Sequence, residues 1–221
     1  MWAIVPIKTF DRAKQRLANV LSEDERRSLM LAMARDVLTC LAKSTQLSGV
    51  LIVSRTPEAK ALAQTFTTAR YAESPEANLA QALAQAAEYL VTHHNARGIM
   101  VVPADVPGIK ASEIDCLLSQ HERVTILPDA DRVGTNGLIC TPPLAIPFIF
   151  DGQSFQPHVD AAIAAGITPK IIPKTAFSLD VDLPCDLLAV SQQHPQSQTA
   201  IYLDKAGIIA RLEPLTESQS G

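Results

Sequence analysis

The stretch AIVPIKTFDRAKQRLANVLSEDERRSLMLAMARDVLTCLAKSTQLSGVLIVS (residues 3–54) decides the fold class, because two short apolar runs flank one long amphipathic segment. The runs Ala3–Ile7 and Val50–Ser54 are typical of strands buried on both faces. The segment Ser22–Lys43 begins with a capping-box pattern, which favours a helix. Its apolar residues recur at the helical four-residue interval: Leu29, Met33, Val37 and Leu41. Strand, helix and strand in this order predict a βαβ unit with parallel strands.

Strand and helix patterns also alternate along the rest of the chain. Further strands are expected at Ile99–Pro103 and Val124–Leu127. Helices are expected from Thr56-Pro57, from Asn78, and over Ala111–His121, Ser154–Ala165 and Pro184–Gln193. Extended pieces are expected at Asn136–Thr141, Ala145–Phe150, Thr168–Pro173 and Ala176–Val181. The pattern predicts an α/β fold with a doubly wound, mostly parallel sheet. We expect one domain over residues 1–195, followed over 196–221 by a small hairpin around Asp204–Gly207 and a frayed tail.

Composition narrows the function classes. The chain has 221 residues, 47% of them hydrophobic, and its 19 Lys and Arg against 23 Asp and Glu give a net charge of −4. An acidic chain without a basic block argues against nucleic acid or an anionic membrane as a partner. No signal peptide and no run of ~18 apolar residues is visible, so a cytoplasmic protein is expected. Nine glycines are about 4% of the chain against a usual ~7%, which argues against a glycine-rich phosphate loop.

A cationic loop follows the first expected strand. It carries Lys8, Arg12, Lys14 and Arg16 within nine residues. Ligands of such sheets bind beyond the carboxyl ends of the strands, and Lys and Arg bind phosphate oxygens. The loop therefore indicates an anion site; a solvated surface loop is the alternative.

Three carboxylates are candidates for a metal site. Asp105 follows a buried strand in the segment PADVP, and Asp180 and Asp182 would share one face of an extended segment. Paired carboxylates repel each other unless a cation neutralises them, and Mg²⁺ prefers oxygen ligands. The alternatives are that Asp105 caps a turn and that Asp182 caps the helix beginning at Pro184.

A further candidate site consists of Gly134-Thr135-Asn136-Gly137 together with the later segment Phe150–His158. Ser154 is a plausible N-cap whose helix would favour an anionic group, and His158 one turn later could add a charge or a donor. A purely structural turn and cap would give the same pattern.

These motifs, taken in order, carry a family resemblance. They are VPIKTFDRAKQRL (5–17), LSEDERRSLMLAMARDVL (21–38), NLAQAL (78–83), VVPADVP (101–107), GTNGL (134–138), DGQSFQPH (151–158) and LDVDLPCDL (179–187). The series, which runs from about residue 2 to 190, resembles the guanylyltransferases of coenzyme F420 biosynthesis, which act on 2-phospho-L-lactate, phosphoenolpyruvate or 3-phosphoglycerate. The resemblance implies a nucleotide-diphosphosugar-transferase-like, Rossmann-like fold and GTP, Mg²⁺ and a small phosphorylated acid as ligands.

The resemblance also implies roles for particular positions. The nucleotide would bind at Pro6, Lys8, Lys14, Arg16, Asn78, Leu79 and Asp105; Asp105, Asp180 and Asp182 would hold magnesium; and Thr135, Asp151, Gly152 and Ser154 would bind the phospho-acid, with His158 beside them. Lys8, Lys14, Arg16 and Asp105 are the expected catalytic residues. Asp151 departs from the glycine that many relatives have there, so the acceptor stays open.

Two alternatives remain at this point. One is a related molybdenum-cofactor or sugar-phosphate nucleotidyltransferase, although those enzymes usually begin with a glycine-rich loop and this chain has no glycine before Gly49. The other is a non-catalytic nucleotide-binding regulator, which would have no need of three acidic positions. A homodimer is compatible with either.

Overall fold

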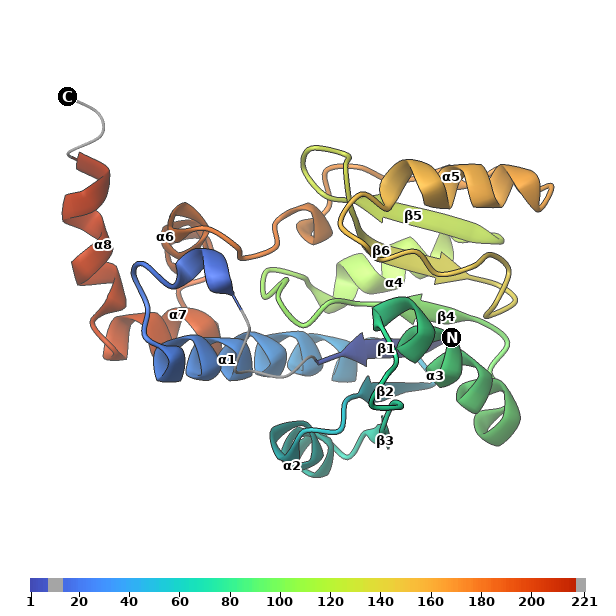
Figure 1. The fold of residues 1–221 in the computed structure, drawn as a ribbon, viewed down its shortest axis with the longest axis horizontal. Coiled ribbons are helices and arrows are strands. Elements are labelled where there is room, and N and C mark those ends of the chain that lie inside the picture. Colours follow the sequence, from blue (N-terminus) through green and yellow to red (C-terminus); the bar gives the residue numbers. More distant parts are fainter. Residues whose placement is uncertain (8–13, 218–221) are drawn as a thin grey trace.

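The sheet has seven strands in the order β3-β2-β1-β4-β6-β5-β7. The structure is a computed structural model that describes residues 1–7 and 14–217 (Figure 1). The strands are β1 (Trp2–Pro6), β2 (Gly49–Val53), β3 (Ala69–Tyr71), β4 (Ile99–Val101), β5 (Val124–Pro128), β6 (Thr135–Cys140) and β7 (Lys170–Ile171). The helices are α1 (Glu23–Ala42), α2 (Pro57–Phe66), α3 (Leu79–His94), α4 (Ala111–Ser119), α5 (Phe155–Ala164), α6 (Pro184–Gln193), α7 (Gln198–Lys205) and α8 (Ile208–Glu217).

The expected mostly parallel sheet is confirmed. β1 pairs in parallel with β2 and β4, β2 with β3, and β5 with β7. β6 alone of the described strands runs antiparallel to both of its neighbours, β4 and β5. The beginning of β6 therefore lies at the same sheet edge as the carboxyl end of β4.

Helices cover both faces of the sheet, as a doubly wound fold requires. Alternating residues of β1 enter different cores: Ala3 and Val5 pack with α1, whereas Ile4 packs with α3. The first core also takes buried residues of α2, α4, α6 and α7, and the second takes Ala162 of α5. The period of two in a strand thus separates two apolar layers.

Local sequence explains where the long helices begin. Ser22 and Glu25 form the expected capping box of α1: the Ser22 hydroxyl accepts from the Glu25 amide, and the Glu25 carboxylate accepts from the Ser22 amide. Asn78 and Gln81 form an equivalent box at α3. The start of α3 lies at the edge of the sheet where the candidate residues lie, because Asn78 and Leu79 line a hollow there together with Pro6. The start of α1 instead contacts α7 and α8, because Glu25 accepts hydrogen bonds from Tyr202 and Arg211.

The predicted C-terminal hairpin is wrong, because this segment forms α7 and α8. Gly207, with a φ of +64°, follows α7 in the left-handed conformation that ends helices, so the turn signal marks a helix end. The Asp36 carboxylate of α1 accepts bonds from the amides of Gln198 and Thr199 and from the Thr199 hydroxyl at 2.6–2.9 Å. Leu203 is buried in the core that contains α1. α8 lies at the opposite end of the molecule from α5 (Figure 1).

Three smaller expectations also differ. Ala145–Phe150 is not a strand, β7 occupies only two residues of Thr168–Pro173, and Ala176–Val181 begins with a 3₁₀ turn, Ala176–Ser178, in place of an extended run. β3 was not expected. The apolar content of these short segments cannot distinguish a strand from a packed irregular segment. The division of the chain at residue 195 stays a prediction.

Candidate active site

The candidate residues meet at one edge of the sheet. β1 and β4 end there, which brings Pro6 and the Pro103–Asp105 segment together, and β6 begins there with Thr135. The loop before α6 adds Asp180 and Asp182, and its Val181 amide donates to the Asp105 carbonyl at 3.0 Å. The topology therefore gathers segments that are far apart in the sequence.

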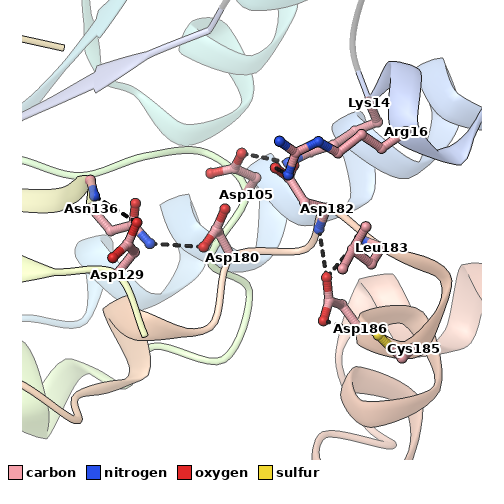
Figure 2. Close-up of polar contacts among 11 residues, drawn as sticks. Lys14, Arg16, Asp105, Asp129, Asn136, Asp180, Asp182, Leu183, Cys185 and Asp186 are labelled. Atoms are coloured by element: carbon pink, nitrogen blue, oxygen red, sulfur yellow. Dashed lines mark hydrogen bonds and ion pairs between the residues drawn. The ribbon is translucent and has the colours of Figure 1, made fainter. Parts of the chain in front are cut away.

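Lys14 joins two of the three expected metal ligands (Figure 2). Its Nζ lies 2.6 Å from Asp105 Oδ2 and 2.6 Å from Asp182 Oδ1, and its side chain is only 6% exposed. Burial lowers the pKa of Lys14, but the charges and hydrogen bonds of Asp105 and Asp182 outweigh it, so the pKa is raised overall. The backbone of Lys14 is left-handed, with a φ of 52°. Lys14 is thus held as a buried ammonium group between two carboxylates.

Asp180 is the third acid of the group, and its hydrogen-bond partner is a neutral amide. Asn136 Nδ2 donates to Asp180 Oδ1 and to the Phe177 carbonyl, both at 2.8 Å. Burial raises the pKa of Asp180, the charges of Asp105 and Asp182 add to this, and the Asn136 bond and Lys14 offset it only in part. We call Lys14, Asp105, Asp180 and Asp182 the carboxylate cluster.

Arg16 lies at the margin of this cluster. Its Nη1 is 3.6 Å from Asp182 Oδ2, and its side chain is 73% exposed. Lys8, the other expected cation, lies outside the described residues. Arg16 therefore lines the hollow beside the cluster as an exposed cation, whereas Lys14 is buried and paired with two acids.

Two residues that sequence reasoning missed hold the cluster in place. One is Asn136, within the motif GTNGL, and the other is Asp186, whose Oδ2 accepts from the amides of Asp182 at 2.9 Å and Leu183 at 2.7 Å (Figure 2). An acid in the first turn of a helix that begins with proline was the available signal for Asp186.

A second polar group consists of Thr135, Ser154 and His158, and we call it the hydroxyl network. The Thr135 amide donates to Ser154 Oγ at 3.0 Å, and the Ile149 amide donates to His158 Nε2 at 2.9 Å. Since Nε2 accepts, the neutral ring carries its proton on Nδ1 and donates it to Thr135 Oγ1 at 3.0 Å. The Thr135 hydroxyl proton is then free to point to a further acceptor.

The network changes two expectations. Ser154 does not cap α5 through its side chain, because its hydroxyl accepts from Thr135 instead. His158 is fully buried behind Thr135, and burial lowers its pKa to about 4. The ring is therefore neutral at pH 7 and supplies neither a charge nor a direct contact surface. Its placement is that of a positioning residue.

Two adjoining hollows lie at this edge of the sheet, and only the first is lined by residues of the two groups. One of about 700 Å³ is lined by Asp105, Asp180, Asp182, Thr135, Gly152 and Ser154. The other, of about 680 Å³, is lined by Arg55, Glu73, Asn78, Phe148, Ile149 and Asp151. Pro6, Leu79 and Phe150 line both. We call the first the acid hollow and the second the base hollow, after the phospho-acid and the nucleobase that are proposed as their ligands below. The structure thus separates Asp151, which faces the base hollow, from its neighbour Gly152.

The donor set suits a hard cation, but the cluster is not arranged as a finished metal site. Carboxylate oxygens are the ligands that Mg²⁺ prefers. Within residues 1–7 and 14–217, no group of three or more His, Cys, Asp or Glu side chains is gathered in a way that could hold a metal ion. The Lys14 ammonium occupies the space between Asp105 and Asp182. The residues fit the ion in charge and chemistry, and Lys14 has to move for both acids to bind it.

Among the helices that the structure describes, none has both the length and the apolar character needed to cross a membrane.

Known proteins match nearly the whole chain. The family "Guanylyl transferase CofC like" matches residues 1–219, so the match extends through α7 and α8, beyond the expected limit near residue 190. The phosphoenolpyruvate guanylyltransferase of Thermobaculum terrenum is 31% identical, over 99% of this chain and 94% of that protein. The 2-phospho-L-lactate guanylyltransferase of Methanobrevibacter smithii is 27% identical, over 94% and 91%.

A crystal structure from Desulfovibrio desulfuricans G20, described as a nucleotide-diphospho-sugar transferase, has the same fold. It superposes with a TM-score of 0.77 at 18% identity and covers 96% of this chain and 97% of that one. The expected fold group is confirmed. With the family match spanning nearly the whole sequence, the chain belongs to the CofC-like guanylyl transferase family and is a nucleotidyltransferase.

Proposed function

We propose that the protein transfers GMP from GTP to a small phosphorylated three-carbon acid, releasing pyrophosphate, in coenzyme F420 biosynthesis. The observation that carries the proposal is that the three acids of the carboxylate cluster line the acid hollow together with Thr135 and Ser154 of the hydroxyl network, and that this hollow adjoins the base hollow. The names of the two guanylyltransferase relatives support the reaction class. A cytoplasmic location and a homodimer belong to the same proposal.

The bond changes are those of an in-line displacement. A phosphate oxygen of the acceptor attacks the α-phosphorus of GTP, a new P–O–P linkage forms, and the bond to the β-phosphate oxygen breaks. The acceptor phosphate is already ionised at pH 7, so no protein base has to remove a proton. This agrees with the state of His158 behind Thr135, which is buried and neutral.

Charge is the main obstacle, because both reactants are polyanions. Arg16, which is exposed beside Asp182, would neutralise phosphate oxygens, and Lys14 would do so after it leaves the two acids. Lys8 is assigned the same task from its sequence position. Asp105, Asp180 and Asp182 would hold Mg²⁺, which polarises phosphoryl oxygens and neutralises developing charge. The protein's contribution is then positioning together with electrostatic stabilisation.

The acceptor would lie in the acid hollow. Thr135 and Ser154 present hydroxyl groups whose oxygens already accept bonds from protein donors, so their protons are available to an anionic ligand. Gly152 has a φ of +92°, and a Cβ added to it would meet nothing within 4 Å, so the backbone there is open to a close ligand. These features suit a phosphate or carboxylate group but do not select one acid.

The test is a pyrophosphate-release assay with GTP, Mg²⁺ and, in separate reactions, 3-phosphoglycerate, 2-phospho-L-lactate and phosphoenolpyruvate. We expect release with at least one acid and none without an acid. Absence of release with all three acids would refute the proposal. Exchange of GTP for ATP or CTP in the productive reaction tests the nucleotide.

A further inference from the structure

Glu73 lies at the sheet edge of the site but outside the carboxylate cluster. It follows β3 by two residues, and because β3 is parallel to β2 and β1, it lies at the edge where Pro6 ends β1. It lines the base hollow together with Arg55 and Asn78. None of the sequence motifs includes it, and the proposed reaction assigns it no task.

The carboxylate of Glu73 lacks hydrogen bonds in the described part of the chain. Its Oε2 is buried and has no partner there, and its Oε1 lies 3.6 Å from Arg55 Nε, a distance suited to an ion pair and too long for a hydrogen bond. Buried polar atoms without a partner are rare and costly in folded proteins. The side chain is 18% exposed and lines the base hollow, so a ligand there can contact the carboxylate.

An ionised carboxylate only accepts hydrogen bonds, so it favours a ligand edge with two neighbouring donors. Among the common bases, guanine alone has such an edge, formed by N1–H and the N2 amino group. Adenine and cytosine place a ring acceptor beside their amino group, and uracil places its single N–H between two carbonyls. The chemistry of Glu73 therefore matches one base.

We propose that Glu73 selects guanine by accepting hydrogen bonds from its N1–H and N2 amino groups in the base hollow. The inference rests on the proposed function, which places the triphosphate at the carboxylate cluster and so directs the base to the adjoining hollow. Arg55 balances the charge of Glu73 from one side, and its Nη2 is anchored by the Pro75 carbonyl at 3.3 Å. Glu73 is a specificity-determining residue.

The test compares nucleotide binding by the whole protein and by Glu73→Gln. Titration calorimetry with GTP, ITP, XTP and ATP, each with Mg²⁺, measures the dissociation constants. We expect the wild-type protein to prefer GTP over ITP, which lacks the N2 amino group, by about tenfold, because one bond is lost. XTP should bind still more weakly, because xanthine has a carbonyl at position 2 that faces the carboxylate.

The glutamine variant should reverse part of this order. Its amide nitrogen faces a donor of guanine but matches the carbonyl of xanthine, while its amide oxygen still accepts from N1–H. We expect GTP binding to weaken by about 10- to 100-fold and XTP binding to strengthen. Glu76→Gln is the matched control, because that carboxylate is exposed and bonded by Ser74 in the same loop; its GTP-to-XTP ratio should equal that of the wild type.

The outcomes distinguish failure of the inference about Glu73 from failure of the proposed function. If Glu73→Gln keeps the wild-type ratio, or weakens all four nucleotides equally without any gain for XTP, Glu73 does not select the base and the inference is overturned. Thermal unfolding of the variant shows whether an equal loss reflects misfolding, and Glu73→Asp, which keeps the charge, should then retain the preference for GTP over XTP. If the wild-type protein does not prefer GTP over ATP, the proposed function itself fails.

Discussion

The carboxylate cluster and the hydroxyl network border the same hollow, but opposite means stabilise them. In the cluster, the Lys14 ammonium neutralises Asp105 and Asp182, and Asp180 depends on a neutral amide. In the network, neutral donors and acceptors match one another, and His158 is bonded at both ring nitrogens. Charge neutralisation stabilises the cluster, whereas matched hydrogen bonds fix the orientation of the groups in the network.

The difference shows how each group can serve a reaction between polyanions. A cluster held by an internal cation can exchange that cation for an external one, so its charges can be redistributed when substrate binds. A neutral network whose acceptors are already paired cannot be rearranged without leaving buried groups unpaired, which is costly. We therefore expect changes in the cluster to affect catalysis and metal binding, and changes in the network to affect stability and its pH dependence.

The largest expected effect is that of Asp105→Asn on turnover. The substitution keeps the shape of the side chain but removes a charge that Lys14 and, by the proposal, magnesium require. We expect the rate of pyrophosphate release to fall by about 10³-fold, in line with the loss of a directed electrostatic interaction, while circular dichroism stays unchanged. Asp160→Asn, which changes an exposed acid of α5 bonded to Gln156, is the control. A folded variant with wild-type turnover would remove Asp105 from the reaction centre.

The next largest effect is a loss of stability at acidic pH caused by His158. Burial lowers its pKa from 6.5 to about 4, so between these values the unfolded chain binds a proton that the folded protein does not. The free energy of unfolding should therefore fall as the pH drops from about 6.5 to about 4. The shift corresponds to at most about 3 kcal/mol. Urea denaturation across this range measures it.

His158→Asn provides the comparison that isolates this group. The amide nitrogen can replace Nδ1 as donor to Thr135 but does not titrate, and the bond from Ile149 is lost. The variant should be less stable at pH 7 by about 1 kcal/mol yet show a shallower decline toward pH 4. His121, whose pKa is also lowered by burial, contributes equally to both proteins. Equal slopes in the two proteins would contradict the assignment.

The same contrast explains what could be predicted from the sequence. The pairing of carboxylates and the family resemblance grouped Asp180 and Asp182 with Asp105, and the three acids line one hollow. Caps and periodicity identified where α1 and α3 begin, and the alternation of strands and helices placed Asp105 after a buried strand at the ligand-binding edge of the sheet. These inferences need only local patterns and the topology of parallel sheets.

Local patterns could not predict the features that depend on long-range packing. The position of Lys14 depends on contacts with residues 91 and 168 positions away, so its cationic character was visible but not its partners. His158 was expected beside the phospho-acid, because no local pattern shows that α5 turns its ring into the interior. Glu73 belongs to no motif, and only the folded chain shows that its carboxylate lacks partners in the described residues.

The smallest expected effect tests the exchange of cations directly. If Lys14 and a divalent ion compete for Asp105 and Asp182, removing the ammonium group should strengthen binding of the ion. We expect Lys14→Met to bind Mn²⁺, a spectroscopic probe in place of Mg²⁺, about tenfold more tightly in the absence of nucleotide, because the ion no longer displaces a buried ammonium group. Electron paramagnetic resonance of free Mn²⁺ measures the affinity. Arg16→Met should change it less, because Arg16 is exposed and lies 3.6 Å from Asp182 alone. Weaker or equal binding by Lys14→Met would mean that the lysine supports the ion in place of competing with it, and the cluster would then be as fixed in its arrangement as the hydroxyl network.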